Sequence, residues 1–312
     1  MRNLAGRLLA LLPILFGLSL LTFALLAMVP GDPVTAMLGL EASPEAIATL
    51  RARLALDRPL PVRFLAWFAR VLVGDFGRSI QSGRPVLGMV GAAIGPTAIL
   101  ALAALAVSVC IALPAGVVAA TRRNRPADFV VSVAALCGLS LPSFWLAIPL
   151  VLGLSIAVPI FPSSGYVPFT SDPLAALHHL VLPAATLGVA LAAASMRMTR
   201  AAMLDVLPAD YIRTAQAKGL SQRRVVWRHA LRNALIPIVT LLGIQLGQLL
   251  GGVVVTETMF AWPGIGKLVV DAIFARDYPV VQGAILLTAT LFVLLNLQTD
   301  MLCAALDPRQ RA

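Results

Sequence analysis

The sequence predicts an all-α integral membrane protein with about six transmembrane helices, an outer amphipathic region and a cytoplasmic loop of short helices. Of its 312 residues, 59% are hydrophobic and only 12% are charged, whereas about a quarter of the residues of a soluble domain are charged. Crossing a bilayer takes about 20 apolar residues per helix. Apolar runs of about that length lie at 9–29, 97–120, 129–159, 180–199, 234–256 and 281–303.

The first run is expected to remain in the protein as a transmembrane helix. It is longer than the core of a signal peptide, no small-residue cleavage site precedes Pro30, and further spans follow. The cysteines also lie inside apolar runs, where a thiol behaves as a small hydrophobic group. Their spacing predicts neither a disulfide framework nor a zinc site; they are Cys110, Cys137 and Cys303.

The distribution of charge predicts the orientation. With the N-terminus in the cytoplasm, the inner segments carry fifteen of the 24 basic residues and four acids, while the outer segments carry nine of each. The remaining acid, Asp300, lies at the inner end of the last span. Short loops rich in Lys and Arg stay in the cytoplasm, so both termini and the long basic loop are expected there. Because orientation accounts for the net charge of +10, no nucleic-acid partner is expected.

The outer region, 30–96, is expected to contain two helices. Ser43 is a candidate N-cap with Pro44 at the first helical position. Further on, an apolar stripe at helical spacing predicts an amphipathic helix at the outer interface. Two roles stay open for it: a cover packed on the bundle, or contact with substrate or a substrate-delivery protein. The stripe consists of Val62, Leu65, Phe68 and Leu72.

Two adjacent histidines, His178 and His179, end an outer loop rich in Pro, Ser and Gly. Neighbouring residues on a helix diverge by about 100°, so the pair is not expected to hold one metal ion from one face. An interfacial role is favoured for both.

The fifth run carries glycines at four-residue spacing, at 243, 247 and 251. Such a stripe lets another helix approach closely. Gln245 and Gln248 lie beside it and must be bonded to protein or water. They either fix helix packing or line a polar passage, and the same choice applies near the end of the sixth run. The polar residues there are Asn296, Gln298 and Asp300.

The polar segment 209–237 lies between two apolar runs and is strongly basic. Gly219 is expected to divide it into two short helical halves, with Ser221 capping the second. Arginines at 224, 228 and 232 would then share one helix face. The segment predicts a docking surface for a cytoplasmic partner, with contact to anionic lipid headgroups as the alternative. Its basic residues are Arg213, Lys218, Arg223, Arg224, Arg228, His229 and Arg232.

The sequence lacks the phosphate-binding loop G-x-x-x-x-G-K-[ST] of an ATPase. The nearest approach, at 264–267, has Ala261 where the first glycine is required and Leu268 where a hydroxyl is required. Neither H-E-x-x-H, G-x-S-x-G nor paired intramembrane carboxylates occur. We therefore expect no enzymatic activity and no resident metal or cofactor.

Four blocks of sequence resemble the permease subunit of a bacterial ABC importer of the dipeptide/oligopeptide/nickel class, the type I binding-protein-dependent family. The likeness runs nearly end to end, and the basic loop is similar to the family's "EAA" motif. Some positions depart from the pattern: Asp210, Gln216 and Cys303. The blocks are VPGDP at 29–33 with LDRPLPVRF at 56–64, GDFGRS at 74–79, the loop residues from Tyr211 to Pro237, and 257–283 followed by Asn296, Asp300 and LDPRQR.

The resemblance implies a type I ABC importer permease fold whose basic loop forms coupling helices. Tyr211, Arg213, Ala215, Lys218, Gly219 and His229 would contact a separate ATPase. Asp32, Asp75, Trp262 and Gly264 would contact an extracytoplasmic substrate-binding protein. Gln245, Gln248 and Asn296 are the candidates to line the passage, with helix packing as the alternative role. The implied partners are a second homologous permease and two ATP-binding subunits, which would bind ATP and Mg.

The expected organisation follows from this topology and resemblance. Residues 1–29 form the N-terminal transmembrane helix, 30–96 the periplasmic region, 97–306 the permease core with its coupling loop at 200–233, and 307–312 a cytoplasmic tail. The location would be the bacterial inner membrane. Dipeptides, oligopeptides, nickel chelates and glutathione all stay open as substrates. The rival function is a self-sufficient secondary transporter, which would need coupling-ion residues at the midplane and usually an inverted repeat.

Overall fold

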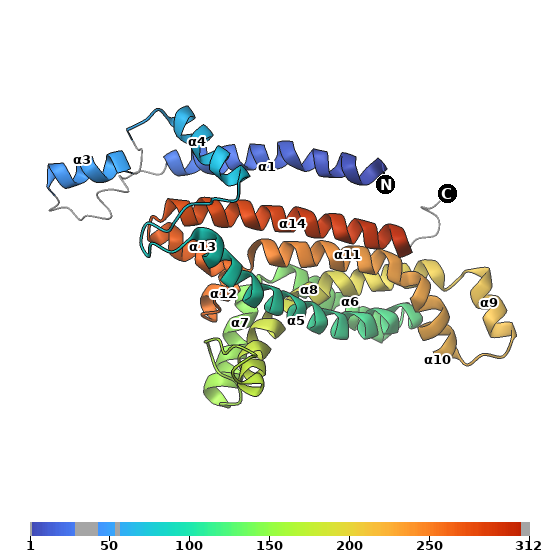
Figure 1. Cartoon of the computed structure of the whole chain (residues 1–312). Coiled ribbons are helices and arrows are strands. Elements are labelled where there is room, and N and C mark those ends of the chain that lie inside the picture. Colours follow the sequence, from blue (N-terminus) through green and yellow to red (C-terminus); the bar gives the residue numbers. More distant parts are fainter. Residues whose placement is uncertain (1, 29–42, 54–56, 307–312) are drawn as a thin grey trace. The chain divides into compact units, whose positions relative to one another are not determined.

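The structure is a computed structural model that describes residues 2–28, 43–53 and 57–306. These residues are mostly helical (Figure 1), and an isolated bridge between Arg78 and Pro85 is the extended pairing found among them. The helices, with η for a π-helix, are α1 (Arg2–Met28), α3 (Pro44–Arg53), α4 (Leu60–Leu72), α5 (Val86–Thr121), α6 (Pro126–Ser140), α7 (Ser143–Val151), η1 (Leu152–Ala157), α8 (Pro173–Val206), α9 (Asp210–Ala217), α10 (Gln222–Arg224), η2 (Val225–Ala230), α11 (Leu231–Gly252), α12 (Val254–Met259), α13 (Ile265–Phe274) and α14 (Tyr278–Leu306).

All six expected apolar runs fall on helices, but not all of these helices meet the length and composition of a membrane span. Within the described chain, four helices do so, and a bent pair raises the count to five. The first expected run falls in α1, where Pro13–Leu25 forms a shorter apolar helix. The four are Val86–Thr121, Pro173–Val206, Gln222–Leu250 and Tyr278–Thr299.

The third run, 129–159, is not one straight helix as the sequence suggested. It consists of α6 followed by α7 and η1, with a bend of 101° between the two parts. Leu141 has extended backbone angles, φ −91° and ψ 128°. The cause is Pro142, because a proline disfavours helical backbone angles in the residue before it.

The chain divides into two compact units. Unit 1 comprises Met1–Pro96 and Pro263–Val293, and unit 2 comprises Thr97–Trp262 and Leu294–Ala312. Helices α5 and α14 contribute residues to both units.

In unit 1, α4 packs against α1 through aromatic side chains. Phe64 and Trp67 of α4 are buried with Phe23 of α1, and the rings of Phe23 and Phe64 meet edge to face at 5.5 Å. The apolar stripe expected from the sequence is largely not the face that packs on α1, because Leu65 is 62% exposed and Leu72 is 70% exposed. Both faces of α4 are apolar, and the one bearing the larger aromatic rings is buried.

A buried carboxylate organises the segment between α4 and α5. Asp277, just before α14, accepts hydrogen bonds from the hydroxyl of Ser79 and from the backbone N–H of Ile80 at 3.0 Å. A third, longer bond comes from the N–H of Gln81 at 3.5 Å. Two of the motif blocks, GDFGRS and the segment containing Asp277, therefore build one local structure.

In unit 2 the long helices approach closely where small residues face each other. A Cβ added to Gly116 of α5 would lie 2.5 Å from Thr199 of α8, and one added to Gly188 would lie 2.6 Å from Val107. Such contacts are typical of helix packing in membranes. Figure 1 shows α9 and α10 at one end of this unit, with α7 and α12 toward the other.

The outward faces of the long helices are apolar. On α5, Leu102 is 57% exposed and Ile111 and Val118 are each 37% exposed. A soluble monomer rarely presents continuous apolar surface of this kind, whereas hydrocarbon tails cover it well. The close helix contacts at glycine and the exposed apolar side chains are therefore both consistent with a bilayer around these helices.

Asp128 of α6 and Arg200 of α8 form a two-point ion pair. The guanidinium donates from Nε to Oδ1 at 2.6 Å and from Nη2 to Oδ2 at 2.9 Å. Asp128 also accepts from the backbone N–H of Asn124, whose φ is +61°. The pair thus joins α6 to α8 and fixes the turn that precedes α6.

Replacing Asp128 with Asn is expected to destabilise the protein by about 2 kcal/mol. The change leaves the Arg200 charge without its partner in a partly buried setting. Thermal unfolding in detergent, followed by size-exclusion chromatography of a fluorescent fusion, measures it. Asp271→Asn is the matched control, because Asp271 pairs with Lys267 at the same 2.6 Å but is 59% exposed; its cost is expected to stay below about 1 kcal/mol. Equal losses in the two variants would contradict the assignment.

Candidate functional site

The segment that follows α8 packs against the long helices of unit 2 through buried side chains. Ile212 of α9 and Val225 of η2 are 1% and 0% exposed, and they share a core cluster with Val117 and Met203. Ala215 belongs to the same cluster at 8% exposure. In this structure Ala215 therefore helps to position α9, and its contact with a partner stays a prediction.

A hydrogen bond joins the two ends of this segment. Asn233 of α11 donates from Nδ2 to the hydroxyl of Tyr211 at 2.9 Å and to the carbonyl of His229 at 3.1 Å. Tyr211 is 43% exposed, and His229 is half-buried. The aromatic ring of Tyr211 is therefore held in place while part of it stays available to a partner.

Gly219 turns the chain after α9, as the sequence predicted. Its φ is +74°, in the left-handed region that glycine adopts without strain. Its N–H donates to the carbonyl of Gln216 at 2.9 Å. A Cβ placed on it would meet no atom within 4 Å, so the turn lies at the surface with open space beside it.

The second half of the segment differs from the expectation of a separate short helix. It continues through α10 and η2 into α11, so that Gln222–Leu250 is one candidate span. Ser221 occupies the N-cap position, but its side chain makes no capping bond. Residues 225–230 form a π-helix, so the α-helical spacing assumed for the arginines at 224, 228 and 232 does not hold throughout. Single π-turns of this kind are frequent at functional sites.

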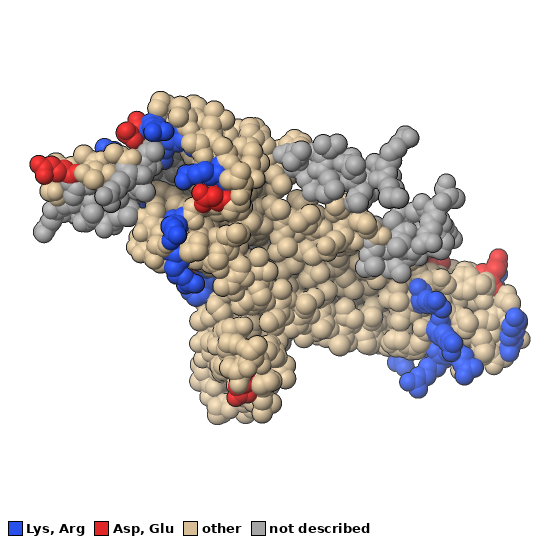
Figure 2. Space-filling view, viewed as in Figure 1, with Lys and Arg blue, Asp and Glu red and all other residues tan. Residues whose placement is uncertain are grey.

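The exposed surface of the segment is basic. Arg213 approaches Asp210 at 3.6 Å, but both are more than 70% exposed, so this pair contributes little. Figure 2 shows Lys and Arg side chains gathered at the end of unit 2 where α9 and α10 lie. We give the name basic surface to these exposed residues of α9 to η2: Tyr211, Arg213, Lys218, Gly219, Arg224 and Arg228.

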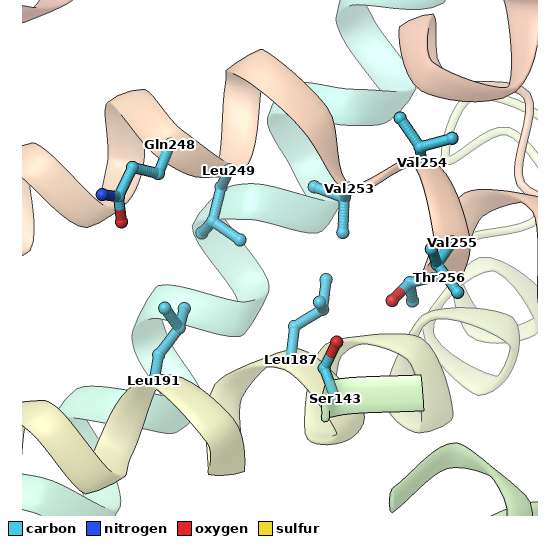
Figure 3. Close-up of a pocket in the computed structure, with 9 residues that line it drawn as sticks. All are labelled: Ser143, Leu187, Leu191, Gln248, Leu249, Val253, Val254, Val255 and Thr256. Carbon is cyan, nitrogen blue, oxygen red and sulfur yellow. The ribbon is translucent and has the colours of Figure 1, made fainter. Parts of the chain in front are cut away.

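A second site is a pocket of about 270 Å³ formed by α7, α8, α11 and α12. Figure 3 shows aliphatic side chains facing one another across it, with Ser143 and Thr256 toward one end and Gln248 toward the other. It is mainly apolar with a few polar groups, a composition typical of small-molecule sites. The aliphatic lining comes from Leu187, Leu191, Leu249, Val253, Val254 and Val255.

The two glutamines of α11 have different surroundings. Gln245 is 4% exposed; its Oε1 accepts from the hydroxyl of Ser195, and its Nε2 donates to the carbonyl of Leu191. It therefore joins α8 to α11. Gln248 is exposed and lines the pocket. Asn296 on α14 is half-buried. Of these three passage candidates, only Gln248 lines this pocket.

The glycine stripe of α11 supports a close helix contact. A Cβ on Gly243 would lie 1.9 Å from Cγ2 of Thr299, so the last part of α14 touches the backbone surface of α11. Gly247 is buried as well. The expectation of close helix approach is confirmed at Gly243, and the partner residue is Thr299.

The residues expected to meet a binding protein have unequal surroundings. Asp75 is exposed and caps the N–H of Gly77 at 2.9 Å, whereas Asp32 lies outside the described residues. Trp262 is 1% exposed, with its ring edge to face with Tyr166 at 4.8 Å, and Gly264 is buried. In this conformation Trp262 and Gly264 pack internally, and their contact with a binding protein stays a prediction.

Three acidic groups with defined partners were not singled out from the sequence. Asp277 and Asp128 are described above, and Glu257 of α12, 0% exposed, accepts from the hydroxyl of Thr97 at 2.7 Å. Glu257 and Asp277 fall inside the motif block at 257–283. An acid within a mainly apolar block is the signal that could have indicated a buried carboxylate, since an unpaired one is costly.

The histidines make separate local contacts. His179 Nδ1 lies 2.8 Å from the carbonyl of Ala175, and the ring of His178 meets Phe161 edge to face. Among the residues that the structure describes, no three His, Cys, Asp or Glu side chains are placed to hold a metal ion.

Comparison with known protein families assigns nearly the whole chain. Residues 112–312 match the family described as "Binding-protein-dependent transport system inner membrane component". Residues 1–101 match "Binding-prot-dependent transport system membrane comp, N-term".

Curated relatives align over almost their full length. The chain is 40% identical over 323 aligned positions to the dipeptide transport system permease protein DppB of Alkalihalophilus pseudofirmus, covering 97% of both chains. It is 43% identical to the glutathione transport system permease protein GsiC of Escherichia coli, covering 98% of this chain and 97% of that one.

Solved structures share the fold at lower identity. The chain is similar to the MetNI methionine ABC transporter in inward-facing crystal forms, with TM-scores of 0.57 and 0.58 and identities of 20% and 19%. The matches cover 70% and 71% of this chain and 96% and 97% of the other.

Proposed function

Because the chain belongs to the family of binding-protein-dependent transport system inner membrane components, we propose that it is the membrane-spanning permease subunit of an ABC importer for short peptides or peptide-like solutes. The main support is the near full-length likeness to permeases named for dipeptide and glutathione transport. The pocket beside Gln248, mainly apolar with a few polar groups, fits a small solute better than a macromolecule.

The basic surface would receive the ATP-hydrolysing subunits. Its residues come from the segment similar to the family's coupling motif, and the buried side chains of Ile212 and Val225 anchor it to the long helices. A displacement of the partner against this surface would therefore be transmitted to α5, α8 and α11. Alternating access then follows from rocking of packed helices around the passage.

The remaining assembly follows the same proposal. A second homologous permease would complete the passage, two ATPase subunits would bind ATP and Mg, and an extracytoplasmic protein would deliver the solute. The basic end of unit 2 would face the cytoplasm, as would both termini, because short basic segments stay inside. The protein itself would have no catalytic role, and its location would be the bacterial inner membrane.

The experiment that tests this function is uptake by proteoliposomes that contain the chain, its partner permease, the ATPase subunits and the binding protein. We expect uptake of radiolabelled dipeptide or glutathione that requires both ATP and the binding protein. Uptake driven by an ion gradient without the ATPase would overturn the proposal and establish a secondary transporter.

Leucine substitutions at the two glutamines of α11 should distinguish a side chain that lines the passage from one that holds two helices together. Gln248→Leu is expected to change uptake by about threefold or more with no change in thermal stability, because this side chain lines the pocket. Gln245→Leu is expected to cost about 1–3 kcal/mol in stability, because the side chain of Ser195 and the carbonyl of Leu191 lose their partner. Both variants are compared by uptake kinetics and thermal unfolding. A loss of stability in Gln248→Leu with changed uptake but normal stability in Gln245→Leu would contradict these two roles.

A further inference from the structure

An open groove of about 620 Å³ lies beside the basic surface in unit 2, between the end of α5 and the segment α10–η2. Its wall is aliphatic, with Val118, Leu207 and Val226 among the lining residues. Two basic residues, Arg122 and Arg223, also line it. Trp227, 45% exposed, also lines it. The groove therefore combines two positive charges, one aromatic ring and an apolar wall.

The ends of three candidate spans meet at this groove. One span ends at Thr121, one ends at Val206, and one begins at Gln222. The groove is lined by Thr121 and Gln222 themselves and by Arg122, Leu207 and Arg223 next to them. A site where apolar spans give way to polar residues lies at the depth of lipid headgroups.

The charge of the groove is not balanced by the protein. No Asp or Glu lines it. Within the described part of the chain, neither Arg122 nor Arg223 has a side-chain hydrogen bond or ion pair. Exposed tryptophan is enriched at the same depth, since its ring is amphipathic. An anionic group with an attached apolar chain complements all of these features.

We propose that this groove binds an anionic phospholipid, with the phosphate between Arg122 and Arg223 and an acyl chain along the wall formed by Val118 and Val226. Basic sites between transmembrane helices are known to hold acidic headgroups in this way. The lipid would contact Trp227 of η2 directly, next to the surface that the proposed function assigns to the ATPase. Lipid composition would thereby influence the position of the π-helical segment.

Quenching of Trp227 fluorescence by brominated phosphatidylglycerol tests the site. The full-length chain is placed in phosphatidylcholine nanodiscs with increasing amounts of the brominated lipid, and the signal of a Trp227→Phe variant is subtracted to remove the other tryptophans. We expect half-maximal quenching at a low mole fraction. The double variant Arg122→Gln with Arg223→Gln should require about tenfold more.

Arg224→Gln with Arg228→Gln is the matched control, because it removes the same charge from exposed arginines that do not line the groove. Unchanged quenching in this control supports a specific site. Equal loss in both double variants would show attraction to net charge alone and overturn the proposal. So would unchanged lipid quenching together with loss of ATPase co-purification in the Arg122 and Arg223 variant, since the groove would then belong to the ATPase interface.

Discussion

Replacing Gly219 with Trp is expected to lower ATP-driven uptake by at least about tenfold while the chain still inserts and folds. The side chain would project into open space, because a Cβ at this position meets no atom within 4 Å. The strain of a non-glycine residue at φ +74° costs about 1 kcal/mol, which a folded chain tolerates. The loss would arise at the partner, where a large side chain at the centre of an interface prevents close docking.

The matched control for this change is Gly83→Trp. Gly83 has a φ of +68° and likewise no neighbour within 4 Å of an added Cβ, but it lies in unit 1. It carries the same strain and the same bulk, so it is expected to leave co-purification of the ATPase unchanged. Wild-type uptake by the Gly219→Trp variant would contradict the assignment of this turn to coupling. If the ATPase failed to co-purify with either variant, the cause would be backbone strain in the permease rather than a specific role of Gly219.

Gly243→Ala is expected to destabilise the protein by about 2 kcal/mol, although it adds a single methyl group. That methyl would lie 1.9 Å from Cγ2 and 2.9 Å from Cβ of Thr299, so α11 and α14 would have to separate. Inserting volume into a close contact costs about 1–3 kcal/mol, which outweighs the gain of up to about 1 kcal/mol in helix propensity. Thermal unfolding of the fluorescent fusion should show a lower midpoint by about 5 °C.

Two further variants test whether the lower stability expected for Gly243→Ala comes from the steric contact with Thr299. Thr299→Gly removes the three atoms nearest to the added methyl, so the double variant Gly243→Ala with Thr299→Gly should recover stability relative to Thr299→Gly alone. Gly95→Ala is the control, because that glycine is also helical and has no atom within 4 Å. It should be neutral or slightly stabilising. A midpoint that falls equally in Gly95→Ala would contradict the explanation.

The helices were largely predictable from the sequence because long apolar runs between polar segments allow few other structures in a bilayer. The break in the third run was missed, although Pro142 is a recognisable helix terminator. The buried face of α4 could not be chosen from periodicity. Both faces are apolar, and the aromatic rings of Phe16 and Phe23 on α1 select Phe64 and Trp67.

For the candidate site, the sequence located the basic segment and its turn but not the role of each residue. Ala215 and Tyr211 lie in one motif, yet the first is buried in a core and the second is held at the surface by Asn233. Gln245 and Gln248 are likewise chemically identical. Their roles differ because only Gln245 faces Ser195 on α8, a contact between positions that are 50 residues apart in the chain.

The most direct test of the basic surface as the coupling site is photo-crosslinking from a benzoylphenylalanine placed at Lys218. Lys218 is exposed and follows α9 immediately. In membranes that contain the whole transporter, we expect a crosslinked product with the ATPase subunit from this position and none from Ser82 of unit 1, which is also exposed. No ATPase product from Lys218, or an equal product from Ser82, would contradict the assignment of coupling to this surface.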